Sequence, residues 1–522
     1  MNTTDFLMIS AAICPDRDFI IFDGKRWSYE QTGERVNRLA FALDGLGVTK
    51  GDRIGIMSTN CPQYIETYFA AAKTGAIFVP LNFRAKSDEL EYMLEASEIK
   101  VLFVAERYRE MVKDLMPKLP KLEASISIKG AFDGMLTYDD LIAKEAEDEF
   151  FADIEDEDNT ILMFTSGTTG RPKAVPMTHD TFSAYILENV DPADPEIEEK
   201  NILTVPLYHV AGIQGMLAAA YGGRSLLLME QFGVKDWLDL VQNEGANRAM
   251  LVPTMLKQLI DAEDFSTYDL SSLAVITYGA ASMPFEVIKR AIELLPDVSF
   301  INAFGQTETG STITMLGPED HKIEGTDEEK DKKLNRLSSS IGKALPDVEV
   351  MIIDENEVPV DVGIVGEIVA MGPRIMSGYW GDEEKTKKAF TADGWLRTSD
   401  RGYMDEDGYI FLTGRADDLI IRGGENISPL EIENVLSTHP KIQEAAVIGV
   451  ASEEWGQEPR AVVVLDPGET VSEEEIIEFC RGRLASFKRP RSVVFLDELP
   501  RSAVGKLSRK GLAEQYGGPQ GE

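Results

Sequence analysis

The chain has 522 residues, of which 43% are hydrophobic and 27% are charged, so it can bury more than one hydrophobic core. At roughly 150 residues per domain, this length predicts three or four structural units. The formal net charge of −38, from 52 Lys and Arg against 90 Asp and Glu, argues against binding to nucleic acid or to an anionic membrane surface, because both would repel the chain at long range. An anionic ligand must therefore bind at a local positive site.

Cysteine and histidine usage argues against two further classes of protein. Cys14, Cys61 and Cys480 are far apart and lack C-x-x-C spacing, which suits a reducing compartment. The four histidines are also scattered, so a protein-held zinc site is not expected. The N-terminal segment has no basic residue before Arg17, unlike a secretory signal, and no run of 18 apolar residues occurs. We expect a cytoplasmic protein without integral membrane association.

The first hundred residues alternate between predicted helices and strands. Ser28 and Gln31 form a capping box, and apolar residues then recur on one helix face. The elements predicted next are strand Arg53–Met57, helix Gln63–Thr74, strand Ile77–Pro80, helix Asp88–Ala96 and strand Val101–Ala105. This alternation predicts a parallel sheet flanked by helices.

The same alternation returns after residue 200. Strands are expected over Ile202–Val205, Ser225–Met229, Ala249–Val252, Leu273–Thr277 and Val298–Asn302. Helices are expected over 212–221, over Lys235–Asn243, from Thr254 onward and over 284–295. Two doubly wound sheets fit this length better than one. The polar and charged stretch 317–340 is expected to be a surface loop.

Two smaller parts complete the chain. From about residue 346, short alternating strands (Glu349–Ile353 and Gly366–Met371) predict a small β-rich unit. The last hundred residues predict a compact α+β unit, with strands at Leu419–Ile421, Ala445–Val450, Ala461–Leu465 and Val493–Leu496. One of its helices starts at Ser428-Pro429, and another starts at Ser472 and bears Ile476, Cys480 and Leu484. The predicted fold class is α/β, with a large N-terminal domain over 1–416 and a small α+β domain over 417–522.

The most informative stretch is 161–173, Ile-Leu-Met-Phe-Thr-Ser-Gly-Thr-Thr-Gly-Arg-Pro-Lys. Its apolar start predicts a strand, and the remainder predicts an anion-binding loop, because Gly167 and Gly170 let backbone N–H groups turn inward. Hydroxyl donors and a cation complete the loop: Thr165, Ser166, Thr168, Thr169 and Lys173. No G-x-x-x-x-G-K-[ST] occurs, so the expected polyphosphate site is not the common P-loop.

A second cluster, Asn302-Ala-Phe-Gly-Gln-Thr-Glu-Thr-Gly310, directly follows a predicted strand. Ligands bind at that end of a parallel sheet. Phe304 could stack on a base, Thr307 could bond a phosphate and Glu308 could hold Mg²⁺. Each of these residues alone would more simply be part of a polar turn.

Other segments are ordinary when taken singly. An ionised Asp400 could accept two hydrogen bonds from a ribose diol, and Arg415 could reach the same sugar, although an Asp before Arg-Gly is otherwise a turn residue. Gly423 and Gly424 predict a turn or bulge. Lys506 lies in a polar loop, where a lysine is usually solvated.

In their common order, the strings TSGTTGRPK, NAFGQTETG and PRSAVGK, with the segments around Asp400 and Arg415, resemble the AMP-forming acyl-CoA synthetase, adenylation-domain and luciferase superfamily. The whole chain is identified as a member. Two departures stand out, since Phe304 takes the place of a frequent tyrosine and Ala174 takes the place of a glycine after Lys173. The aromatic stacking surface is kept.

The resemblance implies a role for each segment. The loop 165–173 covers the β- and γ-phosphates, and Lys506 bridges the carboxylate and the α-phosphate during adenylation. His209, in Pro206-Leu-Tyr-His209, lines or gates the acyl pocket. Asp417 is the hinge of a mobile C-terminal domain. The remaining implied cofactor contacts are Gly279, Ala280 and Ala281 (adenine and acyl pocket), Asn302, Ala303, Phe304 and Gly305 (adenine motif), Asp400 and Arg415 (ribose), and Gly423 and Gly424 (CoA tunnel).

The implied reaction has two halves and uses ATP, Mg²⁺ and coenzyme A. A carboxylate attacks the α-phosphate of ATP to give an acyl adenylate and pyrophosphate, and a thiol then displaces AMP. Gly305, where acetate-activating relatives have tryptophan, together with Gly279 and Gly215, favours a larger aromatic, alicyclic or medium-chain acid. The alternatives are an enzyme that loads a carrier protein and a non-catalytic acyl-adenylate binder. The sequence leaves open a monomer or a homodimer, and the direction of the reaction.

Overall fold

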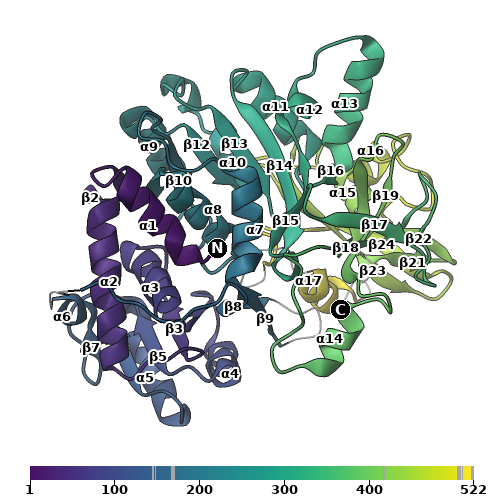
Figure 1. Ribbon diagram of the computed structural model, residues 1–522. Helices are drawn as coiled ribbons and strands as arrows, with labels where there is room; N and C mark the ends of the chain where they lie inside the picture. Colours follow the sequence, from purple (N-terminus) through teal and green to yellow (C-terminus); the bar gives the residue numbers. More distant parts are fainter. Residues whose placement is uncertain are drawn as a thin grey trace.

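The structure is a computed structural model that describes residues 1–143, 146, 148–165, 171–415, 418–501, 507 and 509–518, without the side chain of Asn426. The strands form three sheets of seven, thirteen and five strands. In Figure 1 the chain runs from purple N-terminal helices, through the teal and green middle of the molecule, to a yellow C-terminal unit.

The seven-stranded sheet is the parallel sheet predicted for the first part of the chain, in the order β7-β6-β5-β3-β4-β8-β9. Only β8 and β9 pair antiparallel. Its strands are β3 (Arg53–Met57), β4 (Ile77–Pro80), β5 (Val101–Val104), β6 (Ala124–Ser127), β7 (Leu136–Thr137), β8 (Asn159–Thr165) and β9 (Lys173–Thr178). The accompanying helices are α2 (Tyr29–Gly45), α3 (Pro62–Lys73), α4 (Ser87–Ser97), α5 (Arg109–Leu115) and α6 (Tyr138–Ile142). The capping box of Ser28 and Gln31 forms at the start of α2 as predicted.

The second sheet runs in the order β17-β18-β19-β20-β16-β15-β14-β13-β12-β10-β11-β1-β2. Its α/β half consists of β1 (Asp18–Phe22), β2 (Lys25–Ser28), β10 (Lys200–Leu203), β11 (Ser225–Leu228), β12 (Arg248–Leu251), β13 (Val275–Gly279), β14 (Ser299–Gln306) and β15 (Ser311–Leu316). The helices here are α1 (Thr3–Ile13), α7 (His179–Asn189), α8 (Val210–Tyr221), α9 (Val234–Glu244), α10 (Pro253–Ile260) and α11 (Phe285–Leu294). The prediction of two helix-flanked sheets is therefore confirmed.

One buried apolar cluster joins the two sheets. It contains Ile54 and Phe78 of the first sheet and Leu203 and Leu226 of the second, together with buried residues of α2, α3 and α8. Burying apolar surface contributes roughly 25 cal/mol per Å², so this shared core holds the two sheets in one body. The carboxyl ends of β8 and β14 are thereby fixed relative to each other.

The predicted small β-rich unit is present and is continuous with the second sheet. Strand β16 (Ser340–Ala344) pairs with β15 on one side and with β20 (Ile410–Arg415) on the other. The sheet then continues through β19 (Leu396–Met404), β18 (Gly366–Met371) and β17 (Glu349–Ile353), with α14 (Glu383–Ala389) between β18 and β19. The alternation within single strands could not predict the pairing of β16 with β20, because Ser340 and Ile410 are 70 residues apart in the chain.

The stretch 317–340 was predicted to be a surface loop, and this was wrong. It contains α12 (Pro318–His321) and α13 (Asp327–Ser339). Thr326 and Glu329 form a capping box at the start of α13, which supplies partners for the first free N–H groups of a mostly polar helix. The helix could not be predicted from apolar periodicity, because α13 is mostly charged and Leu337 is its buried apolar residue.

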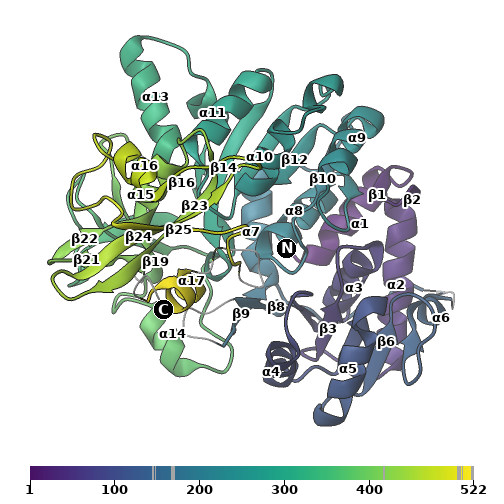
Figure 2. The ribbon, with the colours of Figure 1, turned by 180° about the vertical axis from the view of Figure 1, so that it is seen from behind.

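The five-stranded sheet forms the C-terminal unit, in the order β22-β21-β24-β23 with β25 beside β24. Figure 2 shows this unit on the face turned toward the viewer. Its elements are β21 (Ile420–Arg422), β22 (Glu425–Ile427), α15 (Pro429–Leu436), β23 (Ile442–Ser452), β24 (Gly456–Leu465), α16 (Glu473–Phe479), β25 (Ser492–Phe495) and α17 (Arg509–Tyr516). Helix α16 ends at Phe479, so Cys480 and Leu484 lie beyond it and not within it as predicted.

The fold class is the α/β architecture predicted. The sheet changes between β20 and β21, but residues 416 and 417 lie outside the described residues, so the domain boundary stays a prediction. No helix among the described residues is long and apolar enough to cross a membrane.

Candidate active site

The predicted phosphate loop connects β8 to β9, two strands that pair antiparallel. Thr165, the last residue of β8, pairs with Lys173, the first residue of β9. Ser166, Gly167, Thr168, Thr169 and Gly170 lie outside the described residues. The pairing therefore brings the two described ends of the loop, a hydroxyl and an ammonium group, to the same place.

The second cluster does not follow its strand as predicted, because β14 continues through 302–306. After β14 the chain reverses direction, and β15 pairs antiparallel with β14. This pairing extends β14 beyond the residues that pair with the parallel strand β13. The turn between them is a short 3₁₀ helix, η4 (Thr307–Thr309), closed by Gly310 at φ 60°. This turn carries Thr307 and Glu308, both half-buried.

Glu308 is joined to both ends of the phosphate loop. Its Oε1 accepts hydrogen bonds from the Tyr379 hydroxyl at 3.0 Å and from Thr165 Oγ1 at 3.5 Å. Lys173 Nζ donates to the same Tyr379 hydroxyl at 3.3 Å and lies 4.7 Å from the centre of its ring. The structure thus brings together Thr165, Lys173 and Glu308, which the sequence placed in two separate motifs.

The surroundings of Glu308 fit a Mg²⁺ ion held jointly with a nucleotide. None of the ion pairs among the described residues involves Glu308, although its charge acts on the nearby Arg415 and raises the pKa of that guanidinium. The described residues contain no group of three or more His, Cys, Asp or Glu that could hold a metal by itself. Mg²⁺ is commonly bound through one or two carboxylates together with substrate phosphates, and Glu308 with the hydroxyls of Thr165 and Thr307 suits that mode.

Asp400 and Arg415 form the second half of the site, on neighbouring positions of β19 and β20. Asp400 is 8% exposed, and its Oδ1 accepts from Arg415 Nε at 3.0 Å. Its Oδ2 accepts from Gln306 Nε2 at 2.7 Å. Burial lowers the pKa of Arg415, but the neighbouring Asp400 outweighs this, and the net shift is upward. A carboxylate has about four acceptor positions, so Asp400 keeps capacity for a diol.

Strained and small residues gather around these side chains. Ala280, Ser311 and Ser399 are non-glycine residues at φ 65°, 92° and 62°. Left-handed backbone at such residues costs energy and is concentrated at functional sites. Ala280 and Ala281 are exposed at the end of β13, where their small side chains leave the backbone accessible.

Two glycines of the site are required by backbone packing. A side chain at Gly279 would collide with the carbonyl oxygen of Ala303, and one at Gly305 would collide with that of Ser311. At Gly215, by contrast, the nearest atom to an added Cβ is Leu203 Cδ1 at 3.5 Å, an ordinary contact. Of the three glycines expected to widen the acyl pocket, Gly215 alone could carry a side chain without moving the backbone.

The aromatic and amide residues of β14 are partly engaged in the fold. Phe304 is half-buried and packs against the apolar clusters around Ile341 and Ile313, which leaves part of its ring accessible. Asn302 Nδ2 donates to the Ser340 carbonyl at 3.4 Å. Ala303 pairs with Gly279 in the parallel part of the sheet. Base stacking on Phe304 stays a prediction.

His209 is the N-cap residue of α8 and is half-buried. Its ring centre lies 4.3 Å from that of Tyr208. Because the segment that ends at His209 follows β10, it lies on the carboxyl side of the second sheet. Its role at an acyl pocket is not tested by these contacts.

Gly423 and Gly424 form the two-residue turn between β21 and β22, with φ 57° and 88°. This is the turn expected from the sequence, and both positive φ values favour glycine. A side chain at Gly423 would meet the Trp455 ring at 2.9 Å, whereas the space at Gly424 is open to at least 4 Å. Lys506 and Asp417, the predicted catalytic lysine and hinge, lie outside the described residues.

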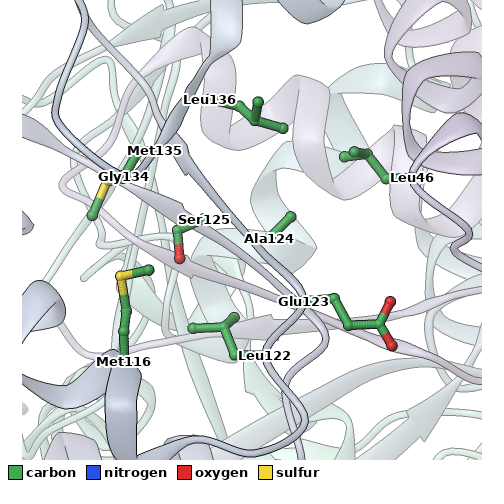
Figure 3. Close-up of a pocket in the computed structure, with 9 residues that line it drawn as sticks. All are labelled: Leu46, Met116, Leu122, Glu123, Ala124, Ser125, Gly134, Met135 and Leu136. Carbon is green, nitrogen blue, oxygen red and sulfur yellow. The ribbon is translucent and has the colours of Figure 1, made fainter.

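A cavity of about 390 Å³ lies elsewhere in the molecule (Figure 3). Its walls include Leu46, Met116, Leu122, Ser125 and Leu136. Because Ser125 and Leu136 stand at the amino ends of β6 and β7, this cavity faces away from the carboxyl ends that carry Thr165 and the other motifs. It is not part of the candidate site.

Sequence reasoning missed three side chains that connect the motifs. Gln306 donates to Asp400 and to the Thr398 carbonyl, each at 2.7 Å, and so ties η4 to β19. Tyr379 bridges Lys173 and Glu308. Arg374, which is fully buried, pairs with Asp347. Gln306 could have been noticed as the unassigned polar residue inside NAFGQTETG, but 372–380 contains no pattern that points to a site.

Comparison with known proteins agrees with this geometry. Residues 9–380 match the family model described as AMP-binding enzyme, and residues 431–506 match the AMP-binding enzyme C-terminal domain. The chain is 32% identical to an indoleacetate–CoA ligase of Aromatoleum aromaticum, covering 98% of this chain and 97% of that protein. It is also 32% identical to the mitochondrial medium-chain acyl-CoA ligase ACSF2 of Mus musculus, covering 99% and 88%.

Solved structures extend the comparison to the whole fold. The anthranilate CoA ligase AuaEII, in complex with anthranoyl-AMP, superposes with a TM-score of 0.89 at 26% identity, covering 99% of this chain and 97% of that one. Family models thus match residues 9–380 and 431–506, and the related enzymes cover 98–99% of this chain. The chain therefore belongs to the AMP-binding enzyme family and is an acid–thiol ligase of the AMP-forming acyl-CoA synthetase type.

Proposed function

We propose that this enzyme uses ATP and Mg²⁺ to convert an aromatic, alicyclic or medium-chain carboxylic acid into its acyl adenylate, and then transfers the acyl group to coenzyme A. The observation that carries the proposal is the linkage of Thr165, Lys173 and Glu308 at one point, with the Asp400–Arg415 pair tied to the same turn through Gln306. A polyphosphate, a divalent cation and a ribose need these three kinds of group.

In the first half-reaction, the acid's carboxylate oxygen attacks the α-phosphorus, and the bond to the pyrophosphate oxygen breaks. Lys173 and the hydroxyl of Thr165 bind the departing phosphates, and Asp400 with Arg415 holds the ribose, so that the nucleotide is kept in line for attack. Glu308 would hold Mg²⁺, which supplies neutralisation of phosphate charge. Lys506 neutralises charge that develops on the carboxylate and α-phosphate in the transition state.

In the second half-reaction, the CoA thiol attacks the acyl carbonyl and AMP leaves. Lys506 and the thiol approach the same carbonyl, so both cannot be present at once. We propose that rotation of the C-terminal domain about Asp417 exchanges Lys506 for the Gly423–Gly424 turn, a hinge step of the kind that often limits turnover. Gly423 and Gly424 then line the approach of the CoA arm.

The proposed class of acid rests on the region around α8 and on the relatives. Gly215 leaves room that a side chain would fill, and Ile213 of the same helix is buried and apolar. The relatives are named for indoleacetate, medium-chain acids and anthranilate. An apolar pocket gains roughly 0.8 kcal/mol for each buried methylene, which favours larger acids over acetate.

A screen of carboxylic acids by AMP release tests the proposal. We expect acid- and CoA-dependent AMP release with benzoate, indoleacetate, anthranilate, cyclohexanecarboxylate or octanoate at a kcat/KM at least about tenfold above that for acetate, because about 1.4 kcal/mol of extra apolar contact suffices. A preference for acetate would overturn the assigned acid class. AMP release that needs the acid but ignores CoA, and responds to a carrier protein, would reassign the acceptor.

The proposed compartment and partners of the enzyme rest on its cysteines and its net charge. Cys14, Cys61 and Cys480 are all free thiols, which suits a reducing compartment, and we propose a cytoplasmic location. The net charge of −38 argues against nucleic-acid partners, and we propose that the acid and CoA bind together with ATP and Mg²⁺.

A further inference from the structure

The segment 372–380 holds the two parts of the phosphate-binding region together. Arg374 donates to the Thr312 carbonyl on β15, and Met376 N donates to the Glu308 carbonyl at 2.9 Å. Trp380 N donates to the Ala174 carbonyl on β9 at 2.8 Å. The segment therefore contacts the Glu308 turn at one end and the exit of the phosphate loop at the other, and Tyr379 lies between these anchors.

The Tyr379 hydroxyl forms a directed chain of hydrogen bonds. Lys173 Nζ donates to the phenolic oxygen at 3.3 Å, and the phenol in turn donates to Glu308 Oε1 at 3.0 Å. A hydroxyl can accept a hydrogen bond from an ammonium group and donate one to a carboxylate at the same time. An aromatic ring without the hydroxyl could not connect the two groups in this way. Lys173 and Glu308 form no direct ion pair in the part of the chain described here.

The separation of these charges has a consequence for ligand binding. A direct Lys–Glu pair would neutralise both groups and would have to be broken before either could bind a ligand. With the phenol between them, Lys173 keeps its charge for phosphate, and Glu308 keeps one carboxylate oxygen for a cation. The Lys173 ammonium group also lies over the face of the Tyr379 ring, 4.7 Å from the ring centre, where a cation–π interaction helps to hold it.

We propose that Tyr379 is a positioning residue for adenylation, which holds Glu308 and Lys173 apart and oriented so that the metal-bound polyphosphate enters between them without breaking an ion pair. This inference rests on the proposed function of the site. It adds a residue outside the recognised motifs and assigns it to the first half-reaction alone, because the thiol transfer no longer involves the β- and γ-phosphates.

The raised pKa of Tyr379 is consistent with a phenol that keeps its proton and donates it in the hydrogen bond to Glu308. Burial raises its pKa, and the nearby Glu308 carboxylate raises the pKa further. The hydroxyl therefore stays protonated throughout the neutral range.

The test compares Tyr379→Phe with wild-type enzyme in both half-reactions. Phe keeps the ring and removes one hydrogen bond to a charged group, so we expect the Mg²⁺ concentration for half-maximal acid-dependent ATP–pyrophosphate exchange to rise about tenfold or more. The KM for the acid and the rate of CoA transfer from supplied acyl adenylate should change less than about twofold. Tyr403→Phe is the matched control, because Tyr403 lies on β19 and stacks on Phe411, 5.0 Å between ring centres.

A second variant separates positioning from simple loss of stability. If Tyr379 acts through Lys173, Tyr379→Phe should have a smaller effect in the Lys173→Met background than in wild type. Equal losses in exchange and transfer, or an unchanged Mg²⁺ requirement, would overturn the proposal. Wild-type enzyme without any acid-dependent exchange would instead refute the proposed function, so the two failures are distinguishable.

Discussion

His321 illustrates how burial fixes the state of a single side chain beside the candidate site. Its Nδ1 lies 2.7 Å from the Gly317 carbonyl, and its Nε2 lies 2.9 Å from the Tyr278 hydroxyl on β13. The neutral ring satisfies both contacts, with Nδ1–H donating and Nε2 accepting. Burial lowers the pKa of His321 to about 4, and burial likewise lowers that of His179 to about 4.

These depressed pKa values predict a loss of stability in mild acid. Between pH 6.5 and about 4 the unfolded chain binds protons that the folded histidines do not, so the free energy of unfolding falls as the pH falls. The contribution is fully present above pH 6.5. For one such histidine the loss at pH 5.5 relative to pH 7.5 is about 1.4 kcal/mol.

His321→Gln tests this expectation by denaturant unfolding at pH 7.5 and pH 5.5. The variant should be less stable than wild type at pH 7.5, because the contact with Tyr278 changes, but its further loss at pH 5.5 should be smaller by about 1.4 kcal/mol. His439→Gln serves as the comparison, because burial lowers the pKa of His439 less than that of His321, so this variant should change the pH dependence of stability in the same direction but by less. An identical pH dependence in wild type and His321→Gln would contradict the assigned neutral state.

The residues of the site show what sequence reasoning could find. The side-chain chemistry of Glu308, Asp400 and Arg415 makes them candidates and the resemblance to the superfamily assigns their roles. The structure places Asp400 beside Arg415. Tyr379 and Gln306 were not found, because their importance lies in the partners they meet after folding. The sequence predicts that Gly305 leaves space for a substrate, whereas the close approach of the Ser311 carbonyl already requires a glycine there.

Among the elements, the hairpin of β21 and β22 gives a test of the second half-reaction. A leucine at Gly424 adds bulk beside the proposed CoA path, where nothing lies within 4 Å of an added Cβ. We expect Gly424→Leu to lower the rate of CoA transfer from supplied acyl adenylate at least tenfold, while acid-dependent ATP–pyrophosphate exchange changes little. The left-handed backbone at φ 88° should also cost about 1–2 kcal/mol of stability.

Gly468→Leu is a matched control for that backbone cost. Gly468 lies in the same unit at φ 84°, also with nothing within 4 Å of an added Cβ. Both variants should lose a similar amount of stability, and Gly424→Leu alone should lose CoA transfer. Unimpaired transfer in Gly424→Leu would remove this turn from the CoA path.

Most elements of the two α/β sheets were predictable because apolar periodicity and helix caps are local signals. Strands Arg53–Met57 and Ile77–Pro80 match the prediction residue for residue. The sequence predicts that strand β14 ends at Asn302, but pairing with β15 extends it to Gln306. Helix α13 was missed because its sequence is almost entirely polar.

At the scale of the whole molecule, replacement of Lys506 is the test that best distinguishes the adenylation step from the CoA-transfer step. Lys506→Ala should lower acid-dependent ATP–pyrophosphate exchange at least about a hundredfold, since removal of a group that stabilises transition-state charge typically costs about 2.7–4 kcal/mol. CoA transfer from supplied acyl adenylate should fall less than about threefold, because the lysine is absent from that step in the proposed rotation.

Lys510→Ala controls for the loss of a nearby charge. Lys510 is in α17, its side chain is 66% exposed, and it lies 3.9 Å from Glu514. Such a surface pair contributes little, so both half-reactions should keep their wild-type rates. Equal losses of exchange and transfer in Lys506→Ala would refute the role assigned to Lys506.

The sequence alone indicated the class of chemistry, because the strings TSGTTGRPK, NAFGQTETG and PRSAVGK occur in an order that resembles the AMP-forming superfamily. That resemblance gives Lys173, Glu308, Asp400 and Lys506 their expected roles. The sequence also determined the α/β alternation, which depends on neighbours within about ten residues. Only the tertiary structure decided which groups meet. The contacts of Tyr379 with Lys173 and Glu308 join positions separated by 206 and 71 residues, and no local pattern encodes such a contact.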